Sequence, residues 1–305
     1  MRTMKLGNSQ LEVPVVAVGC MRINTLSKAQ AEKFIQTSME LGANFFDHAD
    51  IYGGGTCESI FSDAINMSPS VREQMILQTK CGIRKGQFDF SKEHILESVD
   101  GSLKRLKTDY LDVLLLHRPD ALVEPEEVAE AFDRLSASGK VKHFGVSNQN
   151  PMQIELLKKS VKQPLIANQL QLSITNATMI SAGINVNMEN EAAVNRDGSI
   201  LDYCRLNDMT VQPWSPFQYG FFSGVFLDNP AFPELNKTID AIAKTYDVSN
   251  TTIAIAWLLR HPAHMQPVTG TMNLTRLADC CKASEVYLTR EQWYEIYRAA
   301  GNVLP

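Results

Sequence analysis

The chain has 305 residues, of which 44% are hydrophobic and 21% are charged, a composition typical of a soluble globular protein. Its net charge of -5 gives no basic footprint of the kind that nucleic-acid binders show, so we expect no nucleic-acid partner. No apolar run is long enough to span a membrane, and residues 1–10 do not resemble a signal peptide. We therefore expect a cytoplasmic protein without a membrane partner.

The cysteines form no Cys-x-x-Cys pair, and we expect reduced thiols in a reducing compartment. The six are Cys20, Cys57, Cys81, Cys204, Cys280 and Cys281. His261 and His264 have a spacing that metal sites use, but no nearby cluster supplies a third ligand. We expect no metal, and a core of this size needs neither metal nor disulfide for stability.

Short apolar runs alternate with amphipathic stretches along the chain, which predicts parallel strands joined by crossover helices. The run Leu111–Leu116 is almost continuously apolar, as expected for a strand covered on both faces. Eight such strands favour a closed (β/α)8 TIM barrel, an α/β fold of about 250 residues, over an open sheet. We predict one domain over residues 1–305, with strands at 15–20, 44–49, 75–81, 110–117, 143–147, 166–171, 210–214 and 266–270.

Three regions fall outside the eight repeating units. Residues 1–14 contain a turn-forming Gly7-Asn8 pair, which predicts an N-terminal hairpin that closes the bottom of the barrel. Thr289 to Gln292 form a helix start, which predicts an extra C-terminal helix. Residues 173–196 form an unusually long, asparagine-rich loop that is too apolar for disorder, and we expect it to pack at the barrel mouth.

Polar residues gather at the ends of the predicted strands. Asp47 lies near the end of the second strand and Tyr52 follows that strand. Lys80 ends the third strand and His117 ends the fourth. Further polar or aromatic residues at strand ends are Ser147, Asn148, Gln169, Trp214, Ser215, Thr269, Gly270 and Thr271. In a barrel these ends meet at one mouth, where the active sites of this fold lie.

The tyrosine, lysine, aspartate and histidine of this set suit the protonation of a carbonyl oxygen. A free tyrosine, with a pKa of about 10, is a poor proton donor at neutral pH, but a nearby ammonium stabilises the phenolate and lowers that pKa. Lys80 needs a carboxylate partner in an enclosed site, and Asp47 could supply it. His117 could hold the carbonyl oxygen or share in the proton relay. No side chain delivers hydride, so a nicotinamide cofactor is implied.

Five ordered motifs give the chain a family resemblance. They are Asp47-His48-Ala49-Asp50-Ile51-Tyr52-Gly53, Gln78-Thr79-Lys80-Cys81, Leu115-Leu116-His117-Arg118-Pro119, Gly145-Val146-Ser147-Asn148 and Trp214-Ser215-Pro216. Together they resemble the aldo-keto reductases of bacterial type, in the right order over nearly the whole chain. The resemblance implies an NADP-dependent carbonyl reductase that converts an aldehyde or ketone, its small-molecule partner, to an alcohol.

The resemblance also implies a role for each matching residue. Tyr52 matches the general acid, Lys80 and Asp47 the pair that tunes it, and His117 the residue that orients the substrate carbonyl. Trp214 matches the aromatic residue that stacks on the nicotinamide ring. The implied cofactor-binding residues are Gly19, Cys20, Met21, Arg22, Asp47, Ser147, Asn148, Gln169, Trp214, Ser215, Phe217, Gly270, Thr271 and Arg276.

Three positions depart from the family pattern. His48 stands where many members have threonine, outside the catalytic tetrad. Gly270 stands where many have a lysine that faces the adenosine 2′-phosphate, and Cys280 where an asparagine often lies near the adenine. Arg276 matches the arginine that meets the 2′-phosphate, so we expect NADPH to be preferred while NADH remains possible.

Two other functions are compatible with a barrel of this kind. A cofactor-binding regulatory protein, like the potassium-channel β subunits, shares the fold, but a pure sensor has no need for the complete tetrad. An aldolase or isomerase that uses Lys80 as a Schiff base would leave Trp214 without a role. The sequence does not indicate the oligomeric state.

Overall fold

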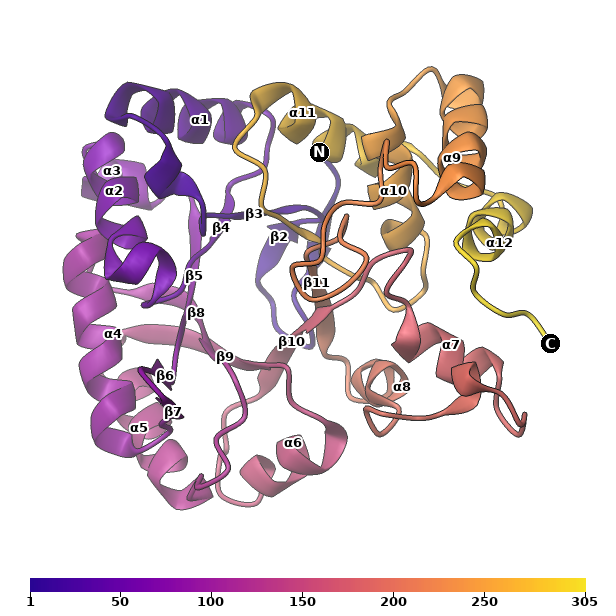
Figure 1. The fold of residues 1–305 in the computed structure, drawn as a ribbon. Helices are drawn as coiled ribbons and strands as arrows, with labels where there is room; N and C mark the ends of the chain where they lie inside the picture. Colours follow the sequence, from indigo (N-terminus) through magenta and orange to yellow (C-terminus); the bar gives the residue numbers. More distant parts are fainter.

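Eight parallel strands close into a barrel in the computed structural model, which describes residues 1–305 (Figure 1). In order around the barrel they are β3 (Ala17–Gly19), β4 (Phe45–Asp47), β5 (Ile76–Cys81), β8 (Leu111–Leu116), β9 (Val141–Ser147), β10 (Leu165–Gln171), β11 (Thr210–Trp214) and β12 (Val268–Thr269). β12 pairs with β3 to complete the ring. The predicted (β/α)8 barrel and all eight of its strands are confirmed.

Strand β8 shows why the apolar runs form this sheet. All six of its residues are buried. Val113 and Leu115 pack inside the barrel with Phe45 and Ile166, whereas Leu114 and Leu116 belong to the outer core beneath the helices. Side chains alternate between the two faces of a strand, so a strand with a helix layer outside and a packed barrel inside must be apolar throughout.

The helices surround the barrel, and most begin at a recognisable cap. Ser27 and Gln30 form a capping box at the start of the first helix, and Pro125 opens another at its first position. The helices are α1 (Lys28–Glu40), α2 (Cys57–Ala64), α3 (Pro69–Arg72), α4 (Lys92–Leu106), α5 (Pro125–Ala137), α6 (Pro151–Lys158), α7 (Thr178–Ile184), α8 (Ile200–Leu206), α9 (Pro233–Tyr246), α10 (Asn250–Leu259), α11 (Leu274–Lys282) and α12 (Arg290–Ala299). Short 3-10 turns occupy Ile23–Thr25, Tyr52–Gly55, Glu191–Ala193 and Ala283–Glu285, and β6 (Ile83–Arg84) pairs with β7 (Gln87–Phe88) in a small hairpin.

The N-terminal hairpin closes the bottom of the barrel, as predicted. β1 (Thr3–Lys5) and β2 (Glu12–Pro14) pair antiparallel, and the turn between them inserts Leu6 among the inward-facing residues of the barrel. Gly7 follows with a φ of +56°, and a Cβ atom there would lie 2.2 Å from the carbonyl oxygen of Ile166. Only glycine fits this close approach, which holds the plug against the barrel floor.

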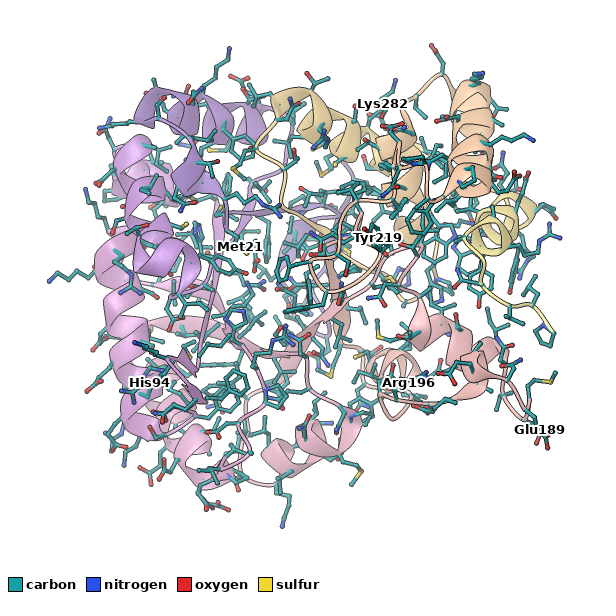
Figure 2. All side chains as sticks on the ribbon, in the orientation of Figure 1. Met21, His94, Glu189, Arg196, Tyr219 and Lys282 are labelled. Carbon is teal, nitrogen blue, oxygen red and sulfur yellow. The ribbon has the colours of Figure 1, made fainter.

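Residues 173–196 start at the mouth, where Ser173 donates a hydrogen bond to the carbonyl of Gln218 at 2.6 Å, but they do not extend over it as predicted. They contain α7 and the 3-10 turn Glu191–Ala193, and none of them lines the cavity at the mouth. Ser181 accepts a hydrogen bond from Tyr297 at 2.9 Å, and Asn185 donates one to the carbonyl of Val303 at 3.1 Å. Figure 2 accordingly shows Glu189 at the rim of the molecule, far from Met21 and Tyr219 near its centre. These two hydrogen bonds hold α7 and the residues after it against the C-terminal segment, and they account for the difference.

All six cysteines are buried, and none is paired in a disulfide. Burial raises the pKa of the Cys81 thiol, which lies next to Lys80, well above its usual value. A buried thiol of that kind stays protonated and unreactive. None of the helices has the length and apolarity that a transmembrane segment requires.

Candidate functional site

A cavity of about 520 Å³ opens at the carboxyl ends of the barrel strands. Its lining includes nearly every residue predicted for catalysis or cofactor binding. These are Gly19, Met21, Arg22, Asp47, Tyr52, His117, Ser147, Asn148, Gln169, Trp214, Ser215, Phe217, Gly270, Thr271 and Arg276. Lys80 and Cys20 are the two exceptions. Lys80 is fully buried beneath the cavity, and Cys20 turns its thiol toward the carbonyl of Val18 in the core.

The Lys80 ammonium is the central contact of the site. Its Nζ lies 2.8 Å from Oδ2 of Asp47, 2.8 Å from the carbonyl oxygen of His48 and 3.0 Å from the hydroxyl oxygen of Tyr52. An ammonium has three donors, and each of them has a partner here. Asp47 ends β4, Lys80 lies at the end of β5, and Tyr52 lies in the turn after β4. The barrel geometry therefore brings these residues together.

Asp47 is held from its other side by buried amides. Its Oδ1 accepts hydrogen bonds from Nε2 of Gln78 at 2.6 Å and from Nε2 of Gln169 at 3.0 Å. Gln212 bonds to both of these glutamines and also donates to Gln266 at 2.9 Å. Gln266 then donates to the carbonyl of Pro14 at 2.7 Å, so the chain of amides crosses the barrel to the N-terminal hairpin.

The sequence interpretation did not assign a role to Gln78, Gln212 or Gln266. A signal for two of them was present, because side chains two positions apart on a strand share a face. Gln78 precedes Lys80 by two positions on β5, and Gln212 precedes Trp214 by two on β11. That spacing places both amides on the inward-facing side of the barrel, below the residues that reach the mouth.

Burial and charge act in opposite directions on Tyr52 and Lys80. Burial raises the pKa of the Tyr52 phenol above its usual value, and the Lys80 ammonium only partly opposes this. We predicted a lowered pKa from the ammonium alone, and burial is the larger effect. For Lys80, burial lowers the pKa, but Asp47 and Tyr52 outweigh it and the pKa ends above its usual value. The pair at neutral pH is therefore a protonated phenol beside a charged ammonium.

His117 stands beside Tyr52 at the same end of the cavity. The two rings meet edge to face with centroids 6.0 Å apart. Burial lowers the pKa of His117 well below its usual value, and the charges of Lys80 and Arg118 add to this effect. Its Nδ1 is buried without a hydrogen-bond partner in the protein. The imidazole is thus neutral at physiological pH, with hydrogen-bonding capacity that the protein does not use.

The wall opposite β4 is built from β9, β10 and β11. Nε1 of Trp214 donates to Oδ1 of Asn148 at 3.2 Å, and Nδ2 of Asn148 donates to Oγ of Ser147 at 2.8 Å. Asn148 and Ser215 have positive φ values of 57° and 51°. Left-handed backbone is uncommon at non-glycine residues, and here it sets the direction of the side chains that follow β9 and β11. These residues present amide, hydroxyl and indole groups along one side of the cavity.

The far end of the cavity is basic and lies at the start of α11. Arg276 is exposed in the first turn of this helix, and Thr271 lies just before it. Arg22 donates to the carbonyl of Gly270 at 3.1 Å, so an arginine from the β3 side lies where a lysine is absent. Guanidinium groups and a helix N-terminus together suit a phosphate group. Cys280 is buried in the core and does not line the cavity.

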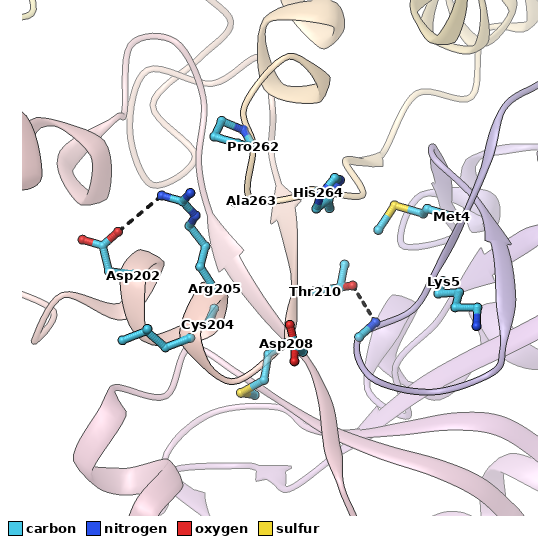
Figure 3. Close-up of a pocket in the computed structure, with 13 residues that line it drawn as sticks. Met4, Lys5, Asp202, Cys204, Arg205, Asp208, Thr210, Pro262, Ala263 and His264 are labelled. Carbon is cyan, nitrogen blue, oxygen red and sulfur yellow. Dashed lines mark hydrogen bonds and ion pairs between the residues drawn. The ribbon is translucent and has the colours of Figure 1, made fainter.

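A larger cavity, of about 810 Å³, lies at the opposite end of the barrel (Figure 3). It is bounded by Met4 and Gly7 of the hairpin, by Thr210 at the start of β11 and by His264. Arg205 and Asp202 form an ion pair of 3.7 Å along one side. No two groups with shifted pKa values lie together in this cavity. The smaller cavity at the mouth is the chemically equipped one.

Asp50 forms part of an acidic cluster behind Tyr52. Its Oδ1 is buried without a hydrogen-bond partner. Burial, with repulsion from Glu58, raises the pKa of the Asp50 carboxyl to about 7. Glu58 is itself buried and accepts from Thr79 at 2.6 Å and from Arg105 at 2.8 Å. His48 packs its ring edge-on against Phe61 and forms no side-chain hydrogen bond, consistent with a position outside the tetrad.

Comparison with known proteins places these features in a family context. A family model described as "Aldo/keto reductase family" matches residues 15–300. The uncharacterized oxidoreductase YcsN of Bacillus subtilis is 36% identical over 95% of this chain and 95% of its own length. A 6-dehydroglucose reductase of Agrobacterium fabrum is 35% identical over 96% of each chain. The crystal structure of a Bombyx mori aldo-keto reductase in complex with NADP superposes with a TM-score of 0.74 at 20% identity, over 98% of this chain and 92% of the other, and this likeness concerns the fold.

The raised pKa of Asp50 predicts how stability depends on pH. Between its usual value of 3.8 and about 7, the folded state binds this proton more tightly than the unfolded chain does. The contribution of Asp50 to stability therefore falls as pH rises through this window. Asp50→Asn removes the titrating group, so we expect the variant to have a higher Tm than the wild type at pH 8 but not at pH 4.

Thermal unfolding of both proteins at the two pH values measures this difference. Asp109→Asn is the control, because Asp109 is exposed and forms no ion pair. The same Tm difference between Asp50→Asn and wild type at pH 4 and pH 8 would mean that Asp50 does not titrate in this window.

Proposed function

The chain belongs to the aldo/keto reductase family, whose members are NAD(P)H-dependent oxidoreductases, and we propose that it reduces an aldehyde or ketone to an alcohol with Tyr52 as the general acid. The observation that carries this proposal is the Lys80 ammonium in contact with both Asp47 and the Tyr52 hydroxyl, at 2.8 and 3.0 Å. A phenol that can donate a proton and an ammonium that can stabilise the resulting phenolate thus lie side by side at the mouth of the barrel.

Each residue of the tetrad has a separate part in the proposed reaction. Tyr52 holds the proton that the carbonyl oxygen takes up, and burial keeps the phenol protonated until then. As the proton leaves, negative charge develops on the phenol oxygen, where the ammonium of Lys80 stabilises it. Asp47 keeps Lys80 charged and fixes its position. His117 is neutral and can donate a hydrogen bond that orients the carbonyl.

A nicotinamide cofactor, when bound, supplies the hydride that the carbonyl carbon receives. The lining of the cavity fits such a cofactor from one end to the other. Ser147, Asn148 and Gln169 would hold the carboxamide, and the Trp214 indole would lie against the ring. Arg276 and Thr271 would hold a 2′-phosphate at the start of α11. A Bombyx mori protein of this fold binds NADP, which supports the same choice here.

The burial of Lys80 argues against a Schiff-base aldolase or isomerase. Such an enzyme needs a neutral amine that reaches the substrate. Lys80 has no exposed surface, is held by three oxygen atoms and has a raised pKa. A regulatory protein that only binds cofactor remains the other candidate, and turnover of 4-nitrobenzaldehyde with NADPH separates it from a reductase.

Tyr52→Phe removes the acidic proton and keeps the ring. We expect kcat to fall by at least about 100-fold, within the usual range for general acid catalysis, with little change in the affinity for NADPH. Steady-state kinetics with 4-nitrobenzaldehyde and a fluorescence titration with NADPH measure the two quantities. Tyr219→Phe is the matched control, since it removes a phenol from the loop after β11 without altering the cavity lining. Near-normal turnover by Tyr52→Phe would assign the acid to another group.

Arg276→Ala tests the site proposed for the 2′-phosphate. One charge-assisted contact contributes about 1.5–3 kcal/mol, so the Kd for NADPH should rise by roughly 10- to 100-fold. The Kd for NADH should hardly change, because NADH lacks that phosphate. We also expect the wild type to prefer NADPH without excluding NADH.

Fluorescence titration with each cofactor gives these constants. Arg298→Ala, which removes an exposed arginine from α12, controls for the loss of one positive charge. Equal losses of affinity for both cofactors, or a wild type that binds NADH more tightly, would show that Arg276 does not meet the 2′-phosphate.

A further inference from the structure

Arg118 presents a positive charge at the substrate end of the cavity without an anionic partner. It follows His117 directly after β8 and lines the cavity together with His117 and Tyr52. No carboxylate of the protein lies within ion-pair distance of its guanidinium. The side chain is half-buried, so solvent compensates this charge only in part.

The neighbours of Arg118 are aromatic. Its Cζ lies 5.6 Å from the ring centroid of Trp214 and 5.8 Å from that of Phe221. Aromatic rings attract a guanidinium but do not accept its N–H groups in the plane of the fork. These contacts therefore hold the guanidinium in place but leave its five N–H donors without hydrogen-bond acceptors.

The charge balance of the cavity indicates what Arg118 can bind. The charged residues of the lining are Arg22, Arg118, Arg276 and Asp47. Asp47 is already paired with Lys80. Arg22 and Arg276 lie at the opposite end of the cavity, which we propose to hold the 2′-phosphate. Burial lowers the pKa of Arg118, and Tyr52 is the ionisable group that opposes this shift, as expected for a cation near the reacting centre.

Substrate entry would remove the remaining water from this guanidinium. Desolvating a charge is costly unless the incoming molecule supplies an opposite charge or several acceptors. A carboxylate does so most completely, because its two oxygen atoms match two parallel N–H donors of the guanidinium. A purely apolar aldehyde would leave the charge uncompensated.

We propose that Arg118 binds a carboxylate of the substrate, so that the substrate is an aldehyde or ketone that bears a carboxylate away from the reacting carbonyl. This inference rests on the proposed reductase activity of the same cavity. The carboxylate takes no part in the reaction; it positions the molecule so that its carbonyl reaches Tyr52 and His117. Arg118 is in this sense a specificity-determining residue.

Two aldehydes that differ only in this charge test the proposal. 4-Carboxybenzaldehyde carries a carboxylate, and methyl 4-formylbenzoate is its neutral ester. With NADPH and the wild-type enzyme, we expect kcat/KM to be about 10- to 100-fold higher for the carboxylate than for the ester, the range for a charge-assisted contact. Arg118→Met should abolish this preference by lowering kcat/KM for the carboxylate alone, and Arg118→Lys should restore part of it.

Arg205→Met is the control, since Arg205 lies at the cavity on the opposite end of the barrel and its loss should leave the ratio unchanged. Turnover of the ester with no preference for the carboxylate would overturn the inference and leave the reductase activity standing. A loss of kcat/KM for neutral D-glyceraldehyde in Arg118→Met as large as the loss for the carboxylate would likewise overturn it, by assigning Arg118 to hydroxyl groups. Equal losses of kcat/KM for both aromatic aldehydes in Arg118→Met would show that Arg118 does not distinguish the carboxylate from the ester. No reduction of any of the three aldehydes would overturn the proposed function together with this inference.

Discussion

The ammonium of Lys80 is completely buried at the centre of the barrel mouth, where an unpaired charge would cost several kcal/mol. Asp47, the His48 carbonyl and the Tyr52 hydroxyl satisfy its three donors. The same three contacts fix the position of Tyr52 relative to the cavity. Removing Asp47 would leave a buried cation without its counter-ion, and removing Lys80 would leave a buried carboxylate. The stability of this mouth and the position of Tyr52, the proposed acid, therefore depend on the same three contacts of Lys80.

The amide chain beneath Asp47 extends this constraint through the barrel. Gln78 and Gln169 hold Oδ1 of Asp47 while Lys80 holds Oδ2, so the carboxylate is bonded at both oxygen atoms. Gln212 and Gln266 continue the chain to the carbonyl of Pro14. A buried polar network whose members all have partners favours one arrangement of its side chains. The N-terminal hairpin thus does more than close the barrel, because it accepts the last hydrogen bond of the network that supports the site.

The alternation of apolar and amphipathic stretches was enough to predict the barrel, and the polar strand ends were enough to predict its mouth. Gln78 was within reach of the same reasoning, since it shares a strand face with Lys80. Its bond to Gln212 was not, because β5 and β11 are not neighbours and meet only when the barrel closes. The position of residues 173–196 was likewise decided by contacts with Tyr297 and Val303, more than 100 residues away in the chain. Arg118 has no anionic partner in the fold, and no local sequence pattern could have predicted this absence.

A double-mutant cycle on Lys80 and Tyr52 tests the central interaction most directly. The cycle compares kcat for Lys80→Met, Tyr52→Phe and the double variant with that of the wild type, using 4-nitrobenzaldehyde and NADPH. If the ammonium acts by stabilising the phenolate of Tyr52, its loss has little further effect once the phenol is absent. The double variant should then be within about threefold of the slower single variant. Reductions in kcat that multiply fully would contradict this, because they would mean that Lys80 and Tyr52 act independently.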